Sequence, residues 1–252
     1  MARPSRVRRS IACCLLAAAA LTGAARADQP QWGYQGRHGA QAWGDLAPGF
    51  ATCKTGRHQA PIDIRDADTT KAALPEIRFG YMPARGRMVN NGHTIQVNMP
   101  PAGGIGLADG EYQLTQYHFH APSEERINGR RYAMGVHLVH RDAQGKLAVV
   151  AVLMRLGKEN QALKPLFARL PARPGDKVTL PLLNPIAMLP PDRGYYRFTG
   201  SLTTPPCSEE VSWQVLKQPV EISAAQLHAF RRLYPMNARP IQPRNGRTIE
   251  SD

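Results

Sequence analysis

The chain has 252 residues, of which 42% are apolar, so it can bury a substantial core and is neither a small disulfide scaffold nor a disordered tail. Its 22 glycines and 22 prolines are scattered without a period, which excludes a collagen-like or linker sequence. The formal net charge of +13 suggests nucleic-acid binding until its position along the chain is considered.

The first 27 residues are typical of a secretory signal peptide. They hold five arginines and no acidic residue, and an apolar run extends over residues 11–21. The small-x-small sequence at 25–27 predicts cleavage before Asp28. We therefore expect one exported domain over residues 28–252, with no membrane span.

Removing the leader lowers the net charge to +8, because its five arginines leave with it. The remaining basic residues form no aromatic-basic repeat, recognition-helix pattern or cluster. We interpret them as a solvated basic surface and expect no nucleic-acid partner.

Four cysteines are present, and two of them, Cys13 and Cys14, belong to the leader. They lie at the start of its apolar run rather than at its end, which disfavours a lipoprotein signal. An oxidising compartment favours one disulfide over two free thiols for Cys53 and Cys207. Such a bond would close a loop of about 150 residues, worth about 4–5 kcal/mol in the chain-entropy model.

Beyond Asp28, most apolar stretches are short and are bounded by Gly, Pro or Asn. Strands are predicted at residues 87–90, 94–98, 112–120, 131–140, 147–156 and 211–216. Two helices are predicted, at 160–170 and at 224–234, and Ser223 with Gln226 forms a capping box before the second. The Pro-rich stretch 170–193 predicts a surface crossing with one strand. The fold class is therefore α+β, mainly β, with a largely antiparallel sheet in a single domain.

Three histidines fall at positions that favour metal binding. His118 and His120 share one face of their strand, because successive side chains alternate and Phe119 takes the other face. An adjacent antiparallel strand can supply His137 as a third imidazole. His140 lies on the face opposite to His137, and we interpret it as structural.

Three neutral imidazoles with an open fourth position are typical of a catalytic zinc site, whereas structural zinc sites are closed by a fourth protein ligand. The alternative is a set of hydrogen-bonded or surface histidines without metal. A second alternative is a cupin-like metal oxygenase, since Glu124 follows the His-x-His pair. The Gly after that glutamate and the second cupin motif are missing, which makes this alternative remote.

Several further motifs occur between Trp32 and Pro243, and together they carry a family resemblance. They are Trp-Gly-Tyr at 32–34, Gln-Ala-Pro-Ile-Asp-Ile at 59–64, Asn-Asn-Gly-His at 90–93, Gln-Tyr-His-Phe-His at 116–120, Ser-Glu at 123–124, His-Leu-Val-His at 137–140, Gly-Ser-Leu-Thr-Thr-Pro-Pro-Cys at 200–207 and Arg-Pro at 239–240. In this order they resemble the alpha-class carbonic anhydrases of the secreted bacterial type. The resemblance implies a twisted, mainly antiparallel ten-stranded sheet with a few short peripheral helices and a conical cleft that ends at zinc.

The resemblance also implies an activity, that of a carbonate dehydratase, which hydrates CO2 reversibly to bicarbonate and a proton. Zinc on His118, His120 and His137 would lower the pKa of its bound water to about 7, an effect for which carbonic anhydrase is the standard example. The resulting hydroxide would attack CO2. Thr203 would accept a hydrogen bond from this hydroxide and donate its own proton to Glu124; neither would ligate the metal. Sulfonamide and anion inhibitors are expected.

Other residues take implied roles by their positions in these motifs. The substrate pocket would be formed by Val139, Val149, Leu202, Thr203, Thr204 and Trp213. His93 would be the proton shuttle, and Tyr34, Asn91 and Gln96 would hold the water chain. Cys53 and Cys207 match the disulfide of secreted members, and Pro61 and Pro206 match positions that are often cis.

A metal-bound histidine usually gives its other N–H to a carboxylate or carbonyl. Gln116 can serve His118, and the backbone near Asn237 can serve His120. For His137 the family pattern has a glutamate two residues earlier, where this chain has Gly135.

Three further positions of the same network depart from the family. They are Glu125 for a histidine, Phe198 for a tyrosine and Ala60 for a serine. We hypothesise that Glu125 reaches into the space above Gly135 and accepts the N–H of His137, so that Phe198 and Ala60 no longer need polar partners. The alternative is that Glu125 points to solvent and water or a carbonyl serves His137.

These departures keep one more alternative open, a weakly active or catalytically silent binding protein that retained the fold. The leader and the exact sequences of the motifs resemble those of Gram-negative members, which implies that the protein is located in the periplasm. The resemblance is also compatible with a homodimer.

Overall fold

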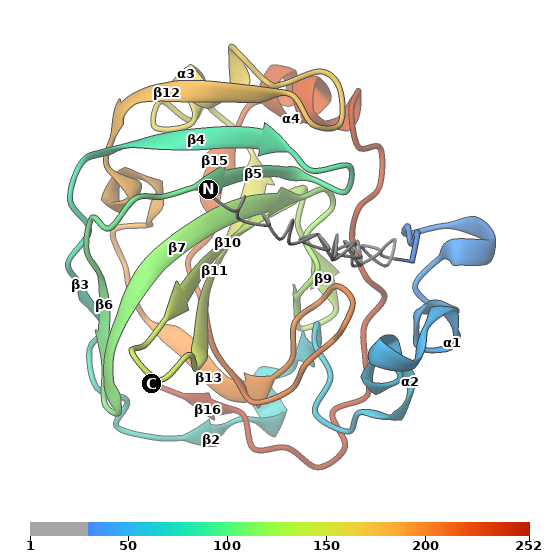
Figure 1. The fold of residues 1–252 in the computed structure, drawn as a ribbon. Coiled ribbons are helices and arrows are strands. Elements are labelled where there is room, and N and C mark those ends of the chain that lie inside the picture. The colour runs from blue at the N-terminus through green and yellow to red at the C-terminus, as the bar shows by residue number, and fades with distance from the viewer. Residues whose placement is uncertain (1–29) are drawn as a thin grey trace, which may run out of the picture.

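The computed structural model describes residues 30–252, and its main feature is a long, twisted sheet that curves from β12 at one end to β2 at the other (Figure 1). The predicted signal peptide lies outside the described residues. Within the described part of the chain, no helix is long and apolar enough to cross a membrane.

Ten strands form the main path of this sheet. In spatial order they are β12 (Lys177–Leu183), β4 (Ala84–Asn90), β5 (Ile95–Asn98), β7 (Gly110–His120), β10 (Met134–Arg141), β11 (Leu147–Leu156), β14 (Val211–Leu216), β13 (Tyr195–Gly200), β16 (Glu250–Ser251) and β2 (Thr70–Lys71). Three strands pair outside this path: β3 (Arg78–Phe79), β6 (Gly104–Leu107) and β15 (Val220–Ile222). A separate small sheet contains β1 (Asp63–Ile64), β8 (Arg126–Ile127) and β9 (Arg130–Arg131). The expected mainly antiparallel sheet is confirmed, although over residues 30–252 it has thirteen strands rather than ten.

The six predicted strands all occur, with ends that differ by at most three residues. Those predicted at 147–156 and 211–216 are β11 and β14 without change. The strand predicted at 131–140 begins later, as β10, because residues 130–131 form β9 in the small sheet. The Pro-rich stretch contains β12, as predicted.

The helices are short and lie at the periphery (Figure 1). They are α1 (Trp43–Leu46), α2 (Thr52–Thr55), α3 (Lys164–Phe167), α4 (Ala224–Arg231) and the 3₁₀ turns η1 (Gly36–His38), η2 (Pro48–Phe50), η3 (Asp66–Asp68) and η4 (Pro185–Met188). The predicted capping box opens α4, with both reciprocal bonds between Ser223 and Gln226.

The helix predicted at 160–170 is wrong in extent, since only the four residues of α3 are α-helical. Pro165 has no backbone N–H and is tolerated only in the first helical turn, so the helix begins next to it. The Asn160 side chain accepts a hydrogen bond from Leu163 N and holds the preceding residues in a turn instead.

The central strands bury both of their faces. On one face Phe119, Val136 and Leu138 join the larger apolar cluster. On the other face Val139 and Val149 belong to a second cluster, and the three candidate metal-binding histidines point to that side. The two-residue period of the strands therefore separates the structural core from the site.

The N-terminal helices are joined to the sheet by the predicted disulfide. Cys53 in α2 is bonded to Cys207 in the loop between β13 and β14. Both cysteines are buried with Trp43 and Phe50 in a third apolar cluster. The peptide bonds before Pro61 and Pro206 are cis, as the resemblance implied, and so is the bond before Pro122.

Candidate active site

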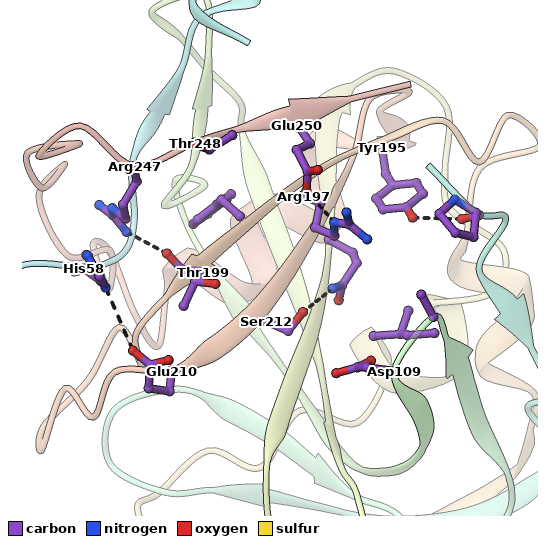
Figure 2. Close-up of a pocket in the computed structure, with 15 residues that line it drawn as sticks. His58, Asp109, Tyr195, Arg197, Thr199, Glu210, Ser212, Arg247, Thr248 and Glu250 are labelled. Carbon is purple, nitrogen blue, oxygen red and sulfur yellow. Dashed lines mark hydrogen bonds and ion pairs between the residues drawn. The ribbon is translucent and has the colours of Figure 1, made fainter. Parts of the chain in front are cut away.

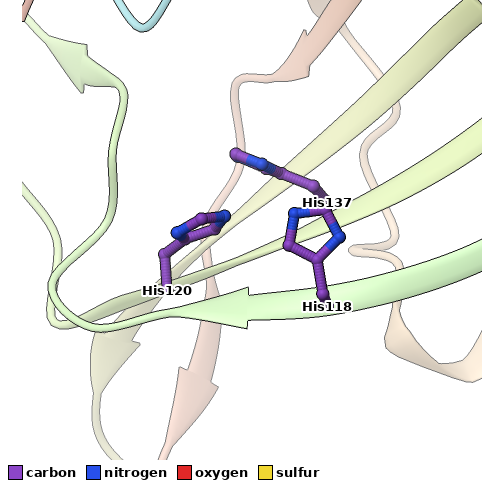
Figure 3. A group of neighbouring side chains, drawn as sticks. All are labelled: His118, His120 and His137. Carbon is purple, nitrogen blue, oxygen red and sulfur yellow. The ribbon is translucent and has the colours of Figure 1, made fainter. Parts of the chain in front are cut away.

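Three imidazole rings converge on one point above the sheet (Figure 3). His118 and His120 rise from the same face of β7, and the antiparallel register places His137 of β10 opposite His118. The ring centroids lie 4.6–5.4 Å apart. Each ring offers a nitrogen within 4.8 Å of the others, which is a spacing that one metal ion can bridge.

The outer nitrogens of the two β7 histidines are held by neighbouring acceptors. His118 Nδ1 lies 2.8 Å from Gln116 Oε1, and His120 Nδ1 lies 2.7 Å from the backbone oxygen of Asn237. Each acceptor fixes its Nδ1 as a donor and leaves Nε2 as the free lone pair of a neutral ring. The structure therefore places both Gln116 and Asn237 where the sequence analysis expects them.

The third ring, that of His137, is held through its other nitrogen. His137 Nε2 lies 3.0 Å from Glu125 Oε2, so Nδ1 is the nitrogen that faces the other two rings. Glu125 is fully buried rather than pointing to solvent. A Cβ at Gly135 would be nearest to Ser123, at 3.6 Å, so this position is not tightly enclosed.

The protonation of these rings suits a metal site. Burial, together with the charge on His137, lowers the pKa of His118 to about 3 and that of His120 well below its usual value. Burial also acts on His137, but Glu125 and Glu124 outweigh it and raise the pKa of that ring. His120 Nε2 is buried without a hydrogen-bond partner among the described residues. Two neutral rings, a third held by a carboxylate, and this orphaned nitrogen fit a zinc ion.

Glu124 lies beside the rings without replacing any of them. Its side chain is fully buried, Oε1 accepts a hydrogen bond of 2.6 Å from Arg239 N, and Oε2 lies 3.4 Å from His120 Nε2. Burial raises the pKa of Glu124 to about 7, and the Thr203 side chain acts in the opposite direction. Thr203 is itself buried and lines the same cavity.

A cavity of about 320 Å³ opens above the three rings. Its wall includes every residue predicted to contact substrate: Val139, Val149, Leu202, Thr203, Thr204 and Trp213. It also includes the four residues predicted for proton transfer: Tyr34, Asn91, His93 and Gln96. The structure thus brings the sequence-predicted groups into one space.

His93 lies on this wall, stacked on Trp32. The two ring centroids are 3.6 Å apart and the planes differ by 7°. Burial lowers the pKa of His93 below its ordinary 6.5. Asn91 Nδ2 donates to Gln96 Oε1 at 3.3 Å, whereas Tyr34 OH is buried and has no partner within residues 30–252.

Five further residues line the cavity without having been predicted as site residues. They are Trp32, Thr94, Thr115, Arg141 and Leu147. Leu147 and Arg141 could have been found, because each lies two positions from a predicted pocket residue on the same strand. The position of Trp32 depends on the folding of the N-terminal segment against the sheet, which no local pattern encodes.

Comparison with known proteins agrees with the geometry of the site. The model of the eukaryotic-type carbonic anhydrase family matches residues 38–252. A carbonic anhydrase of Neisseria gonorrhoeae is 41% identical over 248 residues, covering 98% of each chain. One of Klebsiella pneumoniae is 44% identical over 224 residues, covering 86% of this chain and 89% of the relative.

Among solved structures, the alpha-carbonic anhydrase of Thermovibrio ammonificans, in complex with the inhibitor sulfanilamide, superposes with a TM-score of 0.86 at 44% identity, covering 88% of this chain and 99% of its own. The sheet and the site define an enzyme of the carbonate dehydratase class. The chain belongs to the alpha carbonic anhydrase family. Membership of this family excludes the cupin-like alternative.

Proposed function

We propose that the chain binds one zinc ion through His118 Nε2, His120 Nε2 and His137 Nδ1 and, with it, interconverts CO2 and bicarbonate. The observation that carries this proposal is the set of three inward nitrogens, each opposite a nitrogen held by an acceptor. When bound, zinc lowers the pKa of a coordinated water to about 7, for which carbonic anhydrase is the standard example.

Glu124 and Thr203 would orient the reacting oxygen. Glu124 Oε1 already accepts a hydrogen bond from Arg239 N. Its Oε2 is therefore the atom free to accept a hydrogen bond from the Thr203 hydroxyl. With that proton directed to the carboxylate, Thr203 Oγ1 offers only lone pairs toward the water at the metal. Thr203 Oγ1 would then accept a hydrogen bond from the reacting oxygen and orient a lone pair of that oxygen toward the substrate.

The apolar part of the cavity would hold CO2. Val139, Val149, Leu202 and Trp213 present hydrocarbon and aromatic surface, which suits a small apolar molecule and disfavours water. Thr204, on the same wall, would contact bicarbonate through its hydroxyl. Because the relative from Thermovibrio binds sulfanilamide, we expect sulfonamides and anions to bind this site as inhibitors.

His93 would carry the proton from the site to solvent. Its lowered pKa leaves Nδ1 or Nε2 unprotonated at neutral pH and ready to accept a proton. We expect His93→Ala to lower turnover by about tenfold or more in dilute buffer, because proton transfer then depends on water alone. Concentrated imidazole should restore turnover in the variant and leave the parent unchanged; equal buffer dependence in both would exclude the shuttle role.

The decisive test of the activity is stopped-flow CO2 hydration by the mature chain, together with its zinc content. We expect one zinc per chain, rapid hydration and an apparent pKa near 7. His120→Ala is the matched control and should lose both zinc and activity. Bound zinc without hydration above the buffer rate would instead favour the catalytically silent binding protein.

Glu125 is proposed as the positioning carboxylate for His137, in place of a glutamate at position 135. We expect Glu125→Gln and Glu125→Ala to weaken zinc binding about 10–100-fold. The matched control is Glu159→Gln, at an exposed carboxylate that pairs with Lys164. Unchanged zinc affinity in both Glu125 variants would contradict the role.

A rescue variant separates this role from general damage to the fold. A Cβ at Gly135 would meet only ordinary contacts, at 3.6 Å and beyond. Adding Gly135→Glu to Glu125→Ala should therefore return a carboxylate to His137 and recover zinc affinity. No recovery in a folded double variant would show that the two positions are not exchangeable.

We further propose that residues 1–27 direct export and that the mature chain begins at Asp28 in the periplasm. The arginine-rich, apolar leader and the bacterial relatives support this. The intact mass of protein from a periplasmic fraction should correspond to residues 28–252. Light scattering on the same sample tests the homodimer, which the family resemblance allows.

A further inference from the structure

The wall of the active-site cavity carries one permanent positive charge. Among residues 30–252, no aspartate or glutamate lines this cavity, and Arg141 is the only lysine or arginine that does. His93 also lies on the wall, but its lowered pKa leaves it mostly uncharged at neutral pH. The guanidinium of Arg141 keeps its charge at every physiological pH. No step of the proposed reaction uses this charge.

Arg141 lies at the mouth of the cavity. Side chains alternate along β10, so His137, Val139 and Arg141 follow one another on the face toward the site. His137 is 2% exposed and Val139 is 7% exposed, whereas Arg141 is an exposed residue. The residue opposite Arg141 on β11 is Leu147, which lines the same cavity. The row therefore runs from the metal-binding end of the cavity to its opening, over four residues or about 13 Å at about 3.3 Å each.

The charge of Arg141 is not neutralised by its neighbours. Within the described part of the chain its guanidinium makes one hydrogen bond, from Nη1 to Gly145 O at 3.4 Å, which is longer than the usual range of about 2.7–3.2 Å. The next carboxylate in the sequence is engaged in the turn between β10 and β11, since Asp142 Oδ1 accepts hydrogen bonds from Gln144 N and Lys146 N. The guanidinium is therefore available to an anion that enters the cavity.

A larger cavity, on the opposite face of β14, has a different distribution of charge. Its volume is about 700 Å³, and both arginines and carboxylates line it. Arg197 Nε lies 2.7 Å from Glu250 Oε2, and the Arg247 guanidinium donates to Thr199 O (Figure 2). These guanidiniums already have partners within the wall, so an incoming anion would gain little from them. The active-site cavity differs, because its arginine faces a ligand-binding space whose described wall holds no carboxylate.

We propose that Arg141 is a specificity-determining residue, which makes the active-site cavity bind anions, including bicarbonate, more tightly than neutral ligands of the same shape. This inference rests on the proposed function, in which bicarbonate is the anion formed and consumed. An unpaired charge at the opening of a low-dielectric cavity attracts an anion but has little effect on an uncharged molecule such as CO2. The equilibrium constant fixes the ratio of kcat/KM in the two directions, so Arg141 changes how tightly the anion is held and not the direction of the reaction.

Two sulfonamides of the same shape separate the effect of charge from that of fit. 4-Sulfamoylbenzoate carries an anionic carboxylate where 4-sulfamoylbenzamide carries a neutral amide. We expect the sulfonamide group of both to bind at the metal-binding end of the cavity, so that the para substituent points toward the opening. Calorimetry on the zinc-loaded mature chain gives the two dissociation constants. Their ratio, benzamide over benzoate, cancels the contacts that the two probes share.

At low ionic strength, about 10 mM, we expect this ratio to be about two- to fivefold lower in Arg141→Gln than in the parent. Arg141→Lys keeps the charge and should keep most of the ratio, whereas Arg141→Glu should lower it further. The matched control is Arg155→Gln, which removes the same charge from β11 at a position eight residues beyond Leu147, about 26 Å away, and should leave the ratio nearly unchanged. In about 1 M salt the difference between the parent and Arg141→Gln should disappear, because the Debye length falls to about 3 Å.

Bicarbonate itself is tested through its inhibition of CO2 hydration. Its inhibition constant should be about two- to fivefold higher in Arg141→Gln than in the parent, and the same as the parent's in Arg155→Gln. An unchanged probe ratio in folded Arg141→Gln and Arg141→Glu would overturn this inference and leave the proposed function intact. Failure of both sulfonamides to bind the zinc-loaded parent would instead overturn the proposed function, and this inference with it.

Discussion

Histidines in this chain differ in chemistry because their surroundings differ. His118 and His120 keep a free inward nitrogen since an acceptor holds the outer one. His140, only three residues after His137, instead bonds Tyr81 OH at 2.8 Å on the opposite face of β10, and burial lowers its pKa to about 4. The period of the strand was enough to predict this difference, as the sequence analysis did for His140.

The stack between Trp32 and His93 has a measurable consequence. Burial disfavours the charged imidazolium, and this lowers the pKa of His93 below 6.5. Trp32→Ala removes the ring that covers His93 at 3.6 Å, so the pKa should rise toward 6.5. Imidazole proton resonances followed against pH measure this. Trp32→Phe keeps an aromatic cover and should give an intermediate value; an unchanged pKa in Trp32→Ala would assign the shift to other groups.

At the scale of elements, alternation of apolar residues predicted strands more reliably than apolar spacing predicted helices. β11 and β14 were located to the residue because their side chains pack on both faces. The helix at 160–170 was overestimated because the pattern does not weigh Pro165 against a turn held by Asn160. The strand register, which places His137 opposite His118, depends on long-range pairing and on a bulge after Val139, neither of which is local.

The start of helix α4 was predicted from a local signal alone, its capping box, and this cap can be tested by mutation. Ser223 Oγ accepts a hydrogen bond from Gln226 N, and the Gln226 side chain accepts one from Ser223 N. Ser223→Ala should destabilise the protein by about 1 kcal/mol, since one N-terminal amide loses its partner. A melting temperature lower by about 2–4 °C would show this. Ser223→Asp preserves the cap and should melt like the parent.

In the whole molecule, the N-terminal segment is tied to the site through buried polar groups. The Arg239 side chain is 1% exposed and donates to Gln59 Oε1 and to the backbone oxygens of Ala60 and Cys53. Its backbone N–H holds Glu124. A single residue therefore connects α2, the cis-proline segment and the buried carboxylate of Glu124, a long-range arrangement that the Arg-Pro motif alone did not reveal.

The disulfide adds a covalent tie between the same regions. Cys53 and Cys207 are 154 residues apart, so their bond restricts the unfolded chain far more than the folded one. Cys53→Ala with Cys207→Ala should lower the free energy of unfolding by about 4–5 kcal/mol. Urea unfolding of the oxidised parent and the double variant measures this. Cys207 follows the Thr203–Thr204 loop, which carries none of the three histidines. If the histidines alone hold the metal, zinc affinity should therefore change much less than stability. Equal stability of parent and variant would mean that the apolar cluster around Trp43 already fixes the N-terminal segment.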